Sequence, residues 1–313
     1  MKKKYIVCCM SLLLVSCVKQ ESSEPKEPIH FLFATPLSTH TLWLQARDGM
    51  ETACEELEVY CDWKGPTSID TKEMDDVIYT GLLQKTNGII TQGVIDPELI
   101  EQGRAIGIPF VLVDSGIKDS KPLATITKNF TQQAELLLAD IEATLGKDEK
   151  LYIGLQVSEL TFDLAQQQIE AVKQVFQKHP GGFEITAISE SKSDKLHARE
   201  EWQKVLDRKM NVALNFAGEG ASGCVEAMNA ADLKNDLLIY GVDDMNDTIN
   251  YIRQKKIKGS IVTSFYKYGY DAVYLLYDAY TKELPLDEGE SIAADLLMLN
   301  QENIDTYQKE LNK

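Results

Sequence analysis

Short apolar runs alternate with amphipathic, helix-like stretches along almost the whole chain, and this alternation limits the fold more than any other feature. The runs are apolar at successive positions and are bounded by turn residues, which is typical of strands buried on both faces of a sheet. Strands that alternate with helices pair in parallel, and the helices then cover both faces of the sheet. The sequence therefore predicts an α/β fold with doubly wound parallel sheets.

The alternation runs through the chain twice. In the first half we expect strands at 30–34, 59–63, 88–91 and 110–114 and helices at 41–57, 71–84 and 97–106. After a short extended piece at 124–130, we expect strands at 151–157, 183–188, 211–217, 237–242 and 260–264 and helices at 132–145, 161–178, 195–206, 218–233, 248–257 and 265–280. A chain of 313 residues is too long for one ordinary core. No Pro/Ser-rich linker separates the halves, so we expect two lobes joined by short crossing strands, with the segment from Ser291 completing them.

The first 28 residues carry export signals and no core-forming pattern. Three lysines precede the apolar stretch 5–16, which is shorter than the roughly 20 residues that span a bilayer as a helix. Leu14-Val15-Ser16-Cys17 resembles the lipobox of bacterial lipoproteins, in which the cysteine is acylated and becomes the new N-terminus. We expect 1–16 to be a lipoprotein signal peptide, Cys17 the lipidation site, and 17–28 a polar tether that holds the protein outside the cytoplasm on the membrane. The alternative is an ordinary signal peptide with an incidental cysteine.

Charge and the reactive side chains exclude several classes of function. A formal net charge of -17 argues against nucleic-acid binding, which needs a basic surface. Cys54, Cys61 and Cys224 form neither a disulfide framework nor a zinc pattern, and we interpret all three as core residues. The four histidines have no metal-ligand spacing, and the nucleophile motif G-x-S-x-G is absent from the sequence. We expect no metal, no cofactor and no enzymatic activity.

Residues 218–223 nevertheless match the dinucleotide-binding pattern G-x-G-x-x-G, after a predicted strand and with acids about twenty residues further on. The motif lies deep in the chain, and Glu219 would place a negative charge beside a pyrophosphate. We therefore favour the interpretation that these small residues allow a helix to pack closely on its strand. Asp243 and Asp244 could act together as an acid/base pair. We favour separate roles for them, in which Asp244 caps the next helix.

Polar or aromatic residues recur just beyond the expected strand ends. Ligands in open α/β sheets bind beyond the carboxyl ends of the strands. Carboxylates and amides there can bind vicinal hydroxyls, and flat aromatic rings can pack on the C–H faces of a sugar. The positions are His40 and Trp43, Thr91-Gln92, Asp114-Ser115, Asp243 and Thr263-Phe265. A cleft between two lobes lined in this way suits a small polyhydroxylated ligand. Core packing for Trp43 and loop capping for His40 are the competing interpretations.

Several segments between Ile29 and Lys313 resemble the type I periplasmic binding proteins of the ribose/galactose-binding class. Asp48-Gly49 lies in the first helix. Residues 107–114 are similar to the family strand I-P-V-x-x-x-D, and residues 241–243 to its strand end G-F-D. Residues 259–263 and 302–305 are similar to later family segments. Together, in this order and spacing, these segments are specific to the superfamily.

The resemblance implies two Rossmann-like lobes with parallel sheets, joined by a three-crossover hinge near 127–130, 263–265 and 292–296. One lobe would comprise 29–127 with 265–291, and the other 128–264 with 292–313. It also implies that the lobes close on a monosaccharide and deliver it to an ABC permease. By position, the implied ligand contacts are His40, Trp43, Thr91, Asp114, Gln168, Asp243 and Thr263.

Three positions depart from the family pattern. The usual arginine after the first aspartate is Ser115, the arginine of the second lobe's first helix is replaced within 166–168, and the usual N-D is Ala217-Gly218. With two cations and an amide missing, we expect a ligand other than ribose. The alternative function is a co-receptor of the same fold that senses a sugar or autoinducer 2 and docks onto a membrane histidine kinase.

Overall fold

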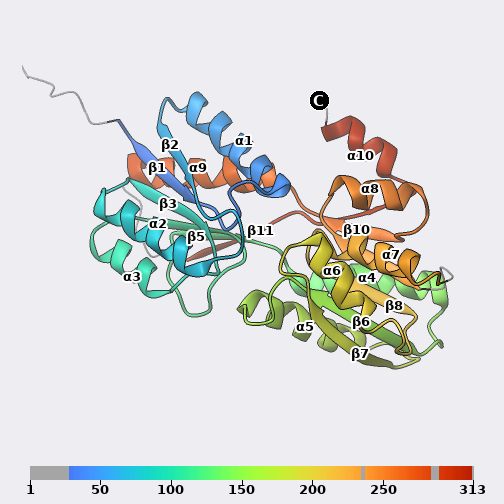
Figure 1. Cartoon of the computed structure of the whole chain (residues 1–313). Helices are drawn as coiled ribbons and strands as arrows, with labels where there is room; N and C mark the ends of the chain where they lie inside the picture. The colour runs from blue at the N-terminus through green and yellow to red at the C-terminus, as the bar shows by residue number, and fades with distance from the viewer. Residues whose placement is uncertain (1–27, 234–236, 283–288, 312–313) are drawn as a thin grey trace, which may run out of the picture.

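The computed structural model describes residues 28–233, 237–282 and 289–311. The expected signal peptide, the lipidation site Cys17 and nearly all of the tether lie outside these residues. The described chain forms two lobes, each built on a six-stranded sheet (Figure 1). The predicted α/β class with two lobes is confirmed.

The first lobe contains β1 (His30–Ala34), β2 (Tyr60–Lys64), β3 (Gly88–Gln92), β4 (Phe110–Asp114), β5 (Ala124–Thr127) and β11 (Glu290–Ala293). The strands are ordered β11-β5-β4-β3-β1-β2, and all of these pairs are parallel. Its helices are α1 (Thr41–Glu56), α2 (Thr71–Leu83), α3 (Glu98–Ala105) and α9 (Phe265–Lys282).

The second lobe contains β6 (Leu151–Val157), β7 (Phe183–Glu190), β8 (Val212–Asn215), β9 (Leu238–Val242), β10 (Gly259–Val262) and β12 (Leu297–Asn300). Their order is β12-β10-β9-β8-β6-β7, and β12 runs antiparallel to β10, which the expectation of parallel sheets did not include. The helices are α4 (Phe130–Leu145), α5 (Asp163–Phe176), α6 (Lys195–Gln203), α7 (Gly220–Ala230), α8 (Asn246–Arg253) and α10 (Ile304–Leu311).

Each sheet separates two apolar layers, which explains the uninterrupted apolar runs of the sequence. In β1, Phe31 and Phe33 pack into the layer beneath α1 and α9, whereas Leu32 and Ala34 pack into the layer beneath α2 and α3. Successive side chains of a strand point to opposite faces, so both sets of positions must be apolar when helices cover both faces.

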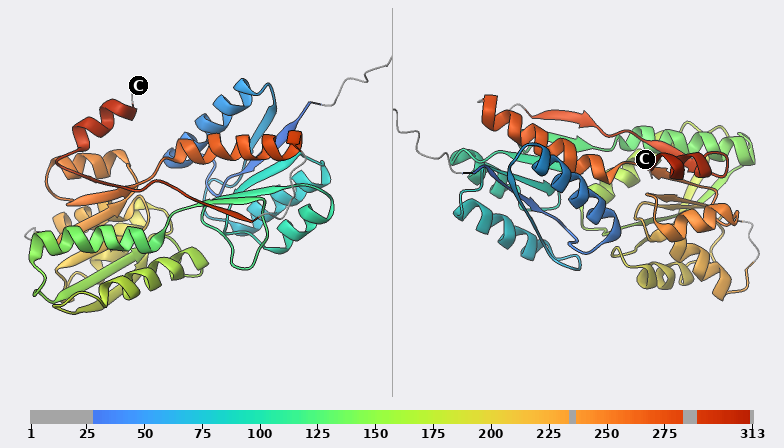
Figure 2. Two further views of the ribbon diagram at one scale, coloured as in Figure 1. Left: turned by 180° about the vertical axis from the view of Figure 1, so that it is seen from behind. Right: turned by 90° about the horizontal axis from the view of Figure 1, so that it is seen from above.

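Helices α1 and α9 lie side by side on one face of the first sheet (Figures 1 and 2). Two glycines permit this contact between backbones. A Cβ atom added at Gly49 would lie 2.0 Å from the carbonyl oxygen of Tyr266, and one added at Gly269 would lie 1.8 Å from that of Ala46. α1 begins at the cleft, and α9 begins where the chain crosses between the lobes. Their contact therefore holds the start of both helices in the first lobe as one rigid unit.

The chain crosses between the lobes three times, and the view from behind in Figure 2 shows these segments between the two sheets. The crossings lie between β5 and α4, between β10 and α9, and between β11 and β12. These places agree with the three crossovers expected from the sequence. A hinge of three short segments allows the lobes to rotate as rigid bodies.

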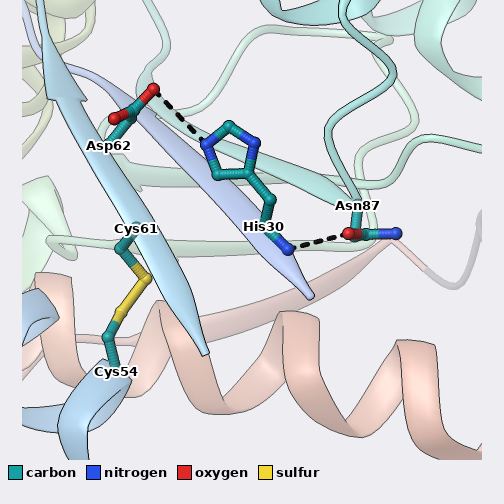
Figure 3. The surroundings of a disulfide bond; sticks show 5 residues. All are labelled: His30, Cys54, Cys61, Asp62 and Asn87. Atoms are coloured by element: carbon teal, nitrogen blue, oxygen red, sulfur yellow. Dashed lines mark hydrogen bonds and ion pairs between the residues drawn. A yellow bond between two sulfur atoms is a disulfide. The ribbon is translucent and has the colours of Figure 1, made fainter. Parts of the chain in front are cut away.

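The expectation that all three mature cysteines are unpaired core residues is wrong for two of them. Cys54, near the end of α1, and Cys61, in β2, form a disulfide with a Cα–Cα distance of 6.4 Å (Figure 3). The helix turns directly into the strand, so two cysteines seven positions apart meet. Closing so short a loop contributes on the order of 2 kcal/mol in the chain-entropy description. Cys224 is unpaired and buried, as predicted.

Candidate functional site

A cavity of about 80 Å³ lies between the lobes, at the carboxyl ends of strands from both sheets. Its position follows the general rule for ligand sites in open α/β sheets. Side chains from both lobes line it, together with Lys128 from the first crossing. Among them are Leu37, His40, Trp43, Gln92, Asp114, Lys128, Ser158, Phe162, Gln168, Phe216, Glu219, Asp243 and Phe265.

One aspartate from each lobe faces this cavity in the same unusual backbone conformation. Asp114 ends β4 with φ of 66°, and Asp243 follows β9 with φ of 64°. A positive φ is uncommon outside glycine, and aspartate and asparagine tolerate it best among the other residues. Such conformations cluster at functional sites, where the surrounding structure must hold them in place.

The two lobes hold these aspartates by the same means. The Thr127 hydroxyl donates to the Asp114 carbonyl at 3.2 Å, and the Ser260 hydroxyl donates to the Asp243 carbonyl at 2.6 Å. In each case the donor belongs to the strand next to the one that the aspartate ends. Gln92 also donates from Nε2 to Asp114 Oδ2 at 2.7 Å. The backbone of both aspartates is therefore fixed in this conformation, and Gln92 also orients the Asp114 carboxylate.

Lys128 joins the two carboxylates across the cleft. Its Nζ lies 2.8 Å from Asp114 Oδ1 and 3.5 Å from Asp243 Oδ1, and it also lies 5.4 Å from the centre of the Phe265 ring. Burial disfavours the charged amine, but the charges of Asp114 and Asp243 outweigh this effect and raise the pKa of Lys128. Lys128 is therefore a buried cation that partly neutralises two buried acids.

The carboxyl group of Asp243 has an unusually high proton affinity. Burial is the largest cause, and the nearby charges of Asp114, Asp244 and Glu219 act in the same direction against the opposing effect of Lys128. The pKa of Asp243 is thereby raised to about 6. Gln168 Oε1 and His40 Nδ1 are buried atoms without a hydrogen-bond partner in the described part of the chain, and Asp243 Oδ1 has only its ion pair with Lys128 at 3.5 Å. Buried polar atoms normally have partners, so these atoms are available to a ligand.

Aromatic rings form much of the remaining wall. Trp43 and Phe265 meet edge to face, with ring centroids 5.3 Å apart, and both line the cavity from the first lobe. Phe162 and Phe216 line it from the second lobe. Trp43 also belongs to the core beneath α1 and α9, so the core and cleft interpretations of this residue both apply.

The structure brings five of the seven predicted ligand contacts to the cavity and leaves two away from it. His40, Trp43, Asp114, Gln168 and Asp243 line the cavity. Thr91 does not, because adjacent side chains in β3 point to opposite faces and it is Gln92 that faces the cleft. Thr263 instead lines a separate hollow beside the third crossing, with Ser264 and Ile292.

Lys128 and Glu219 also line the cavity, although neither is among the contacts predicted from the sequence. Lys128 follows β5, so the strand-end argument applied to Asp114 would also have found it. The two arginines expected to be missing are absent at Ser115 and at 166–168, but a lysine that was not expected enters the cavity from the hinge. Glu219 comes directly before α7, within the glycine-rich segment.

The glycines of that segment serve packing, as the sequence interpretation favoured. A Cβ atom at Gly220 would lie 2.9 Å from Asn215 Cβ, and one at Gly223 would lie 2.8 Å from Ala198 Cβ. The expectation that Asp244 caps the following helix is wrong. Met245 occupies the N-cap of α8 without a side-chain bond, and Asp244 Oδ2 instead accepts a hydrogen bond from the Tyr307 hydroxyl at 3.0 Å.

Neither a membrane span nor a metal cluster is evident in the described ranges. None of the helices there is both long and apolar enough to cross a bilayer. Likewise, those residues contain no grouping of three or more His, Cys, Asp or Glu side chains suited to hold a metal ion.

Comparison with known proteins places the fold in a family. Residues 31–284 match the sequence model of the family described as "Periplasmic binding protein domain". The ribose import binding protein RbsB of Bacillus subtilis (strain 168) is 22% identical over 276 residues, which cover 82% of this chain and 86% of that protein.

Solved structures agree in fold. The glucose-galactose binding protein GanP from Geobacillus stearothermophilus has a TM-score of 0.80 at 21% identity, covering 89% of this chain and 99% of that one. A chain of the XylFII-LytSN complex has a TM-score of 0.79 at 21% identity, with the same coverage. With a family model that matches most of its length and a two-lobed architecture shared with these structures, the chain belongs to the periplasmic binding protein family and has its type I fold.

Proposed function

We propose that the protein captures a monosaccharide or a similar small polyol between its lobes. The observation that carries this proposal is the pair of left-handed aspartates, Asp114 and Asp243, which face one cavity from different lobes. Carboxylates accept hydrogen bonds from vicinal hydroxyls, and charge-assisted bonds of this kind are the stronger ones. The rings of Trp43 and Phe216 provide flat apolar surface for the C–H faces of a sugar. Because each lobe supplies one carboxylate, a bound polyol favours closure.

The charge of the cavity supports a ligand without negative charge. Asp114, Asp243 and Glu219 are buried acids, whereas the cavity's cationic groups are Lys128 and, when protonated, His40. A carboxylate on the ligand would add a further buried charge of the majority sign, which is costly without a partner. A neutral sugar avoids this cost.

The names of the relatives support the same class of ligand. RbsB is a ribose import binding protein and GanP is a glucose-galactose binding protein. We propose an extracytoplasmic solute-binding protein that delivers its sugar to an ABC permease, and that is held at the membrane by lipid on Cys17. The replacement Cys17→Ser should move the protein from the membrane fraction to the soluble fraction after cell lysis, because it removes the acylated residue. The replacement Cys224→Ala, at a buried thiol, should leave it membrane-bound; release of both variants, or of neither, contradicts the anchor.

The second candidate is a ligand-sensing co-receptor of a membrane histidine kinase. Two observations favour it: the likeness to a chain of the XylFII-LytSN complex, and a row of tyrosines along α9, of which Tyr266 is exposed and Tyr270 and Tyr274 are half-buried beside the end of α1. Tyr266 and Tyr270 stack with centroids 5.9 Å apart, and Tyr270 and Tyr274 are 4.9 Å apart. Tyrosine is enriched at protein interfaces. Measuring whether the sugar-loaded protein binds a sensor domain or a permease encoded beside it decides between the two functions.

A thermal-denaturation screen tests the ligand class. The panel should contain ribose, arabinose, glucose, galactose, allose, deoxysugars and autoinducer 2, with glucuronate and galacturonate as matched anionic controls. A ligand present at one hundred times its Kd adds about 2.7 kcal/mol to the stability of the folded state. For a chain of 313 residues that raises Tm by on the order of 5 °C.

We expect at least one neutral member of the panel to give such a shift and both uronates to give none. A panel in which no neutral sugar moves Tm contradicts sugar capture. A shift produced by a uronate contradicts the charge argument.

A further inference from the structure

His40 and Glu219 form a contact across the cleft that exists only while the lobes are together. His40 directly precedes α1 in the first lobe, and Glu219 directly precedes α7 in the second. The Nε2 atom of His40 meets the Oε1 atom of Glu219 between them. Both side chains are largely buried, with 18% and 9% of their surfaces exposed. Because the two residues belong to different lobes, opening of the cleft must separate them.

This pair has no evident task within either lobe. His40 occupies the N-cap of α1, yet its side chain makes no capping bond there. Its Nδ1 atom is buried and has no partner among the described residues. Glu219 likewise makes no side-chain capping bond at the start of α7. The contact therefore connects the lobes and contributes nothing visible to the helices that carry it.

The surroundings of His40 favour its protonated form in the closed arrangement. Burial lowers the pKa of His40, but the hydrogen bond and charge of Glu219, together with the charge of Asp243, outweigh burial and raise the pKa above its ordinary value. The charged and titratable groups that line the same cavity are Asp70 before α2, Asp114 at the end of β4, Lys128 after β5, Glu219 before α7 and Asp243 after β9. Acids outnumber bases in this set, so a proton on His40 is stabilised.

We propose that His40 and Glu219 act as a pH-dependent latch between the lobes, with protonated His40 holding the cleft closed. Both residues are positioning residues in this scheme: they hold the ligand-binding groups of the two lobes together. The inference rests on the proposed function only in requiring that the lobes open and close. The ligand contact expected of His40 stays a prediction, because Nε2 contacts Glu219 whereas Nδ1 has no partner among the described residues.

The direction of the pH effect follows from linkage. A histidine whose pKa is higher in the closed state stabilises that state fully below its ordinary pKa of about 6.5, and the effect is lost as pH rises through the raised value. Each unit by which closure raises the pKa changes the closed-to-open ratio about tenfold across that range. The ligand-free protein should therefore be more closed at mildly acidic pH than at alkaline pH.

Acrylamide quenching of tryptophan fluorescence measures this closure without a ligand. Trp43 lines the cavity and is 5% exposed in the closed arrangement, so opening should expose it to the quencher. The full chain in detergent is compared at about pH 6 and about pH 9, on either side of the expected histidine titration. Trp63 and Trp202 are present in every variant and contribute a common background.

Three variants and a control make the test specific. Quenching of the natural protein should increase with pH. His40→Gln, which cannot be charged, should lose the part of this increase that belongs to His40, and Glu219→Gln should do the same. His40→Lys, which keeps a positive charge, should remain closed at the higher pH. His197→Gln is the matched control, because His197 lies near Glu201 at 3.9 Å within one helix of the second lobe. It should behave like the natural protein.

Two results would overturn the latch. One is a pH response of His40→Gln equal to that of the natural protein, and the other is opening of His40→Lys at the higher pH. Circular dichroism establishes that each variant is folded, and the two substitutions of His40 with opposite expected outcomes keep the test decisive. The measurement contains no sugar, so its failure leaves the thermal-shift result intact, and a failed sugar panel leaves the latch test intact.

Discussion

Replacing Lys128 by methionine should lower the free energy of unfolding by about 3–5 kcal/mol near neutral pH, as is typical when one partner of a buried ion pair is removed. The ammonium group lies against Asp114 and Asp243, and its side chain is only 9% exposed. Methionine fills a similar volume without charge. The substitution therefore leaves two buried carboxylates whose mutual repulsion is no longer offset.

The loss should shrink as pH falls. The pKa of Asp243 is already raised to about 6, and removal of the opposing effect of Lys128 raises it further. A carboxyl group with a higher pKa in the folded protein than in the unfolded chain makes the folded state more stable as pH decreases. Urea unfolding of the variant at about pH 7 and about pH 5 should thus show a smaller defect at the lower pH, where Asp243 is protonated.

A matched surface substitution separates this effect from the loss of any lysine. Lys267 pairs with Asp295 at 3.3 Å, but the two side chains are 60% and 93% exposed. Lys267→Met should change stability by no more than about 0.5 kcal/mol. The double variant Lys128→Met/Asp114→Asn should recover part of the loss, because it removes one of the stranded charges. Equal stability of Lys128→Met and the natural protein would mean that the ammonium does not compensate the carboxylates.

Replacing Asp243 by asparagine should weaken the binding of the sugar found in the thermal screen by on the order of one hundredfold, corresponding to about 2–3 kcal/mol for charge-assisted hydrogen bonds. The fold should survive, because the change is isosteric and removes a charge from a cavity with an excess of acids. Isothermal titration calorimetry measures the affinity. In the natural protein, affinity should also fall as pH decreases through about 6, where Asp243 takes up a proton. Asp243→Asn should lack this part of the pH dependence.

Asp244 provides the neighbouring control. Its carboxylate accepts a hydrogen bond from Tyr307 and does not line the cavity. Asp244→Asn should bind the sugar within about twofold of the natural protein, since it alters no contact in the cleft. Undiminished affinity of Asp243→Asn would show that this carboxylate is structural and would remove the central support for the proposed site.

The sequence locates a side chain at the cleft where its position at the end of a strand alone decides where it lies. Asp114 and Asp243 follow buried apolar runs, and a residue at the end of such a run must face the edge of the sheet. The prediction for Thr91 was wrong, because Gln92 lines the cavity instead. Adjacent residues of a strand point to opposite faces, and both Thr91 and Gln92 are polar, so the sequence alone does not show which of them faces the cleft. The pattern of apolar runs therefore locates the strand ends that border the site, but it does not decide to which face each side chain there points.

Contacts between residues far apart in the chain could not be predicted from the sequence. His40 and Glu219 are 179 positions apart, and nothing in either local pattern indicates that they meet. The Cys54–Cys61 disulfide was missed for a different reason. Both cysteines fall on segments that pack well as core, and only the tight turn between helix and strand brings their Cα atoms to 6.4 Å.

The late position of β11 and β12 in the chain has a consequence for biogenesis. β11 pairs with β5 and β12 pairs with β10, so each sheet receives one of its outer strands from the segment after residue 289. Until that segment has been synthesised, β5 and β10 end their sheets with unpaired backbone groups, which invite pairing with other chains. A nascent or truncated chain that stops short of β11 is therefore exposed to aggregation at both lobes at once, although most of its core residues are already present.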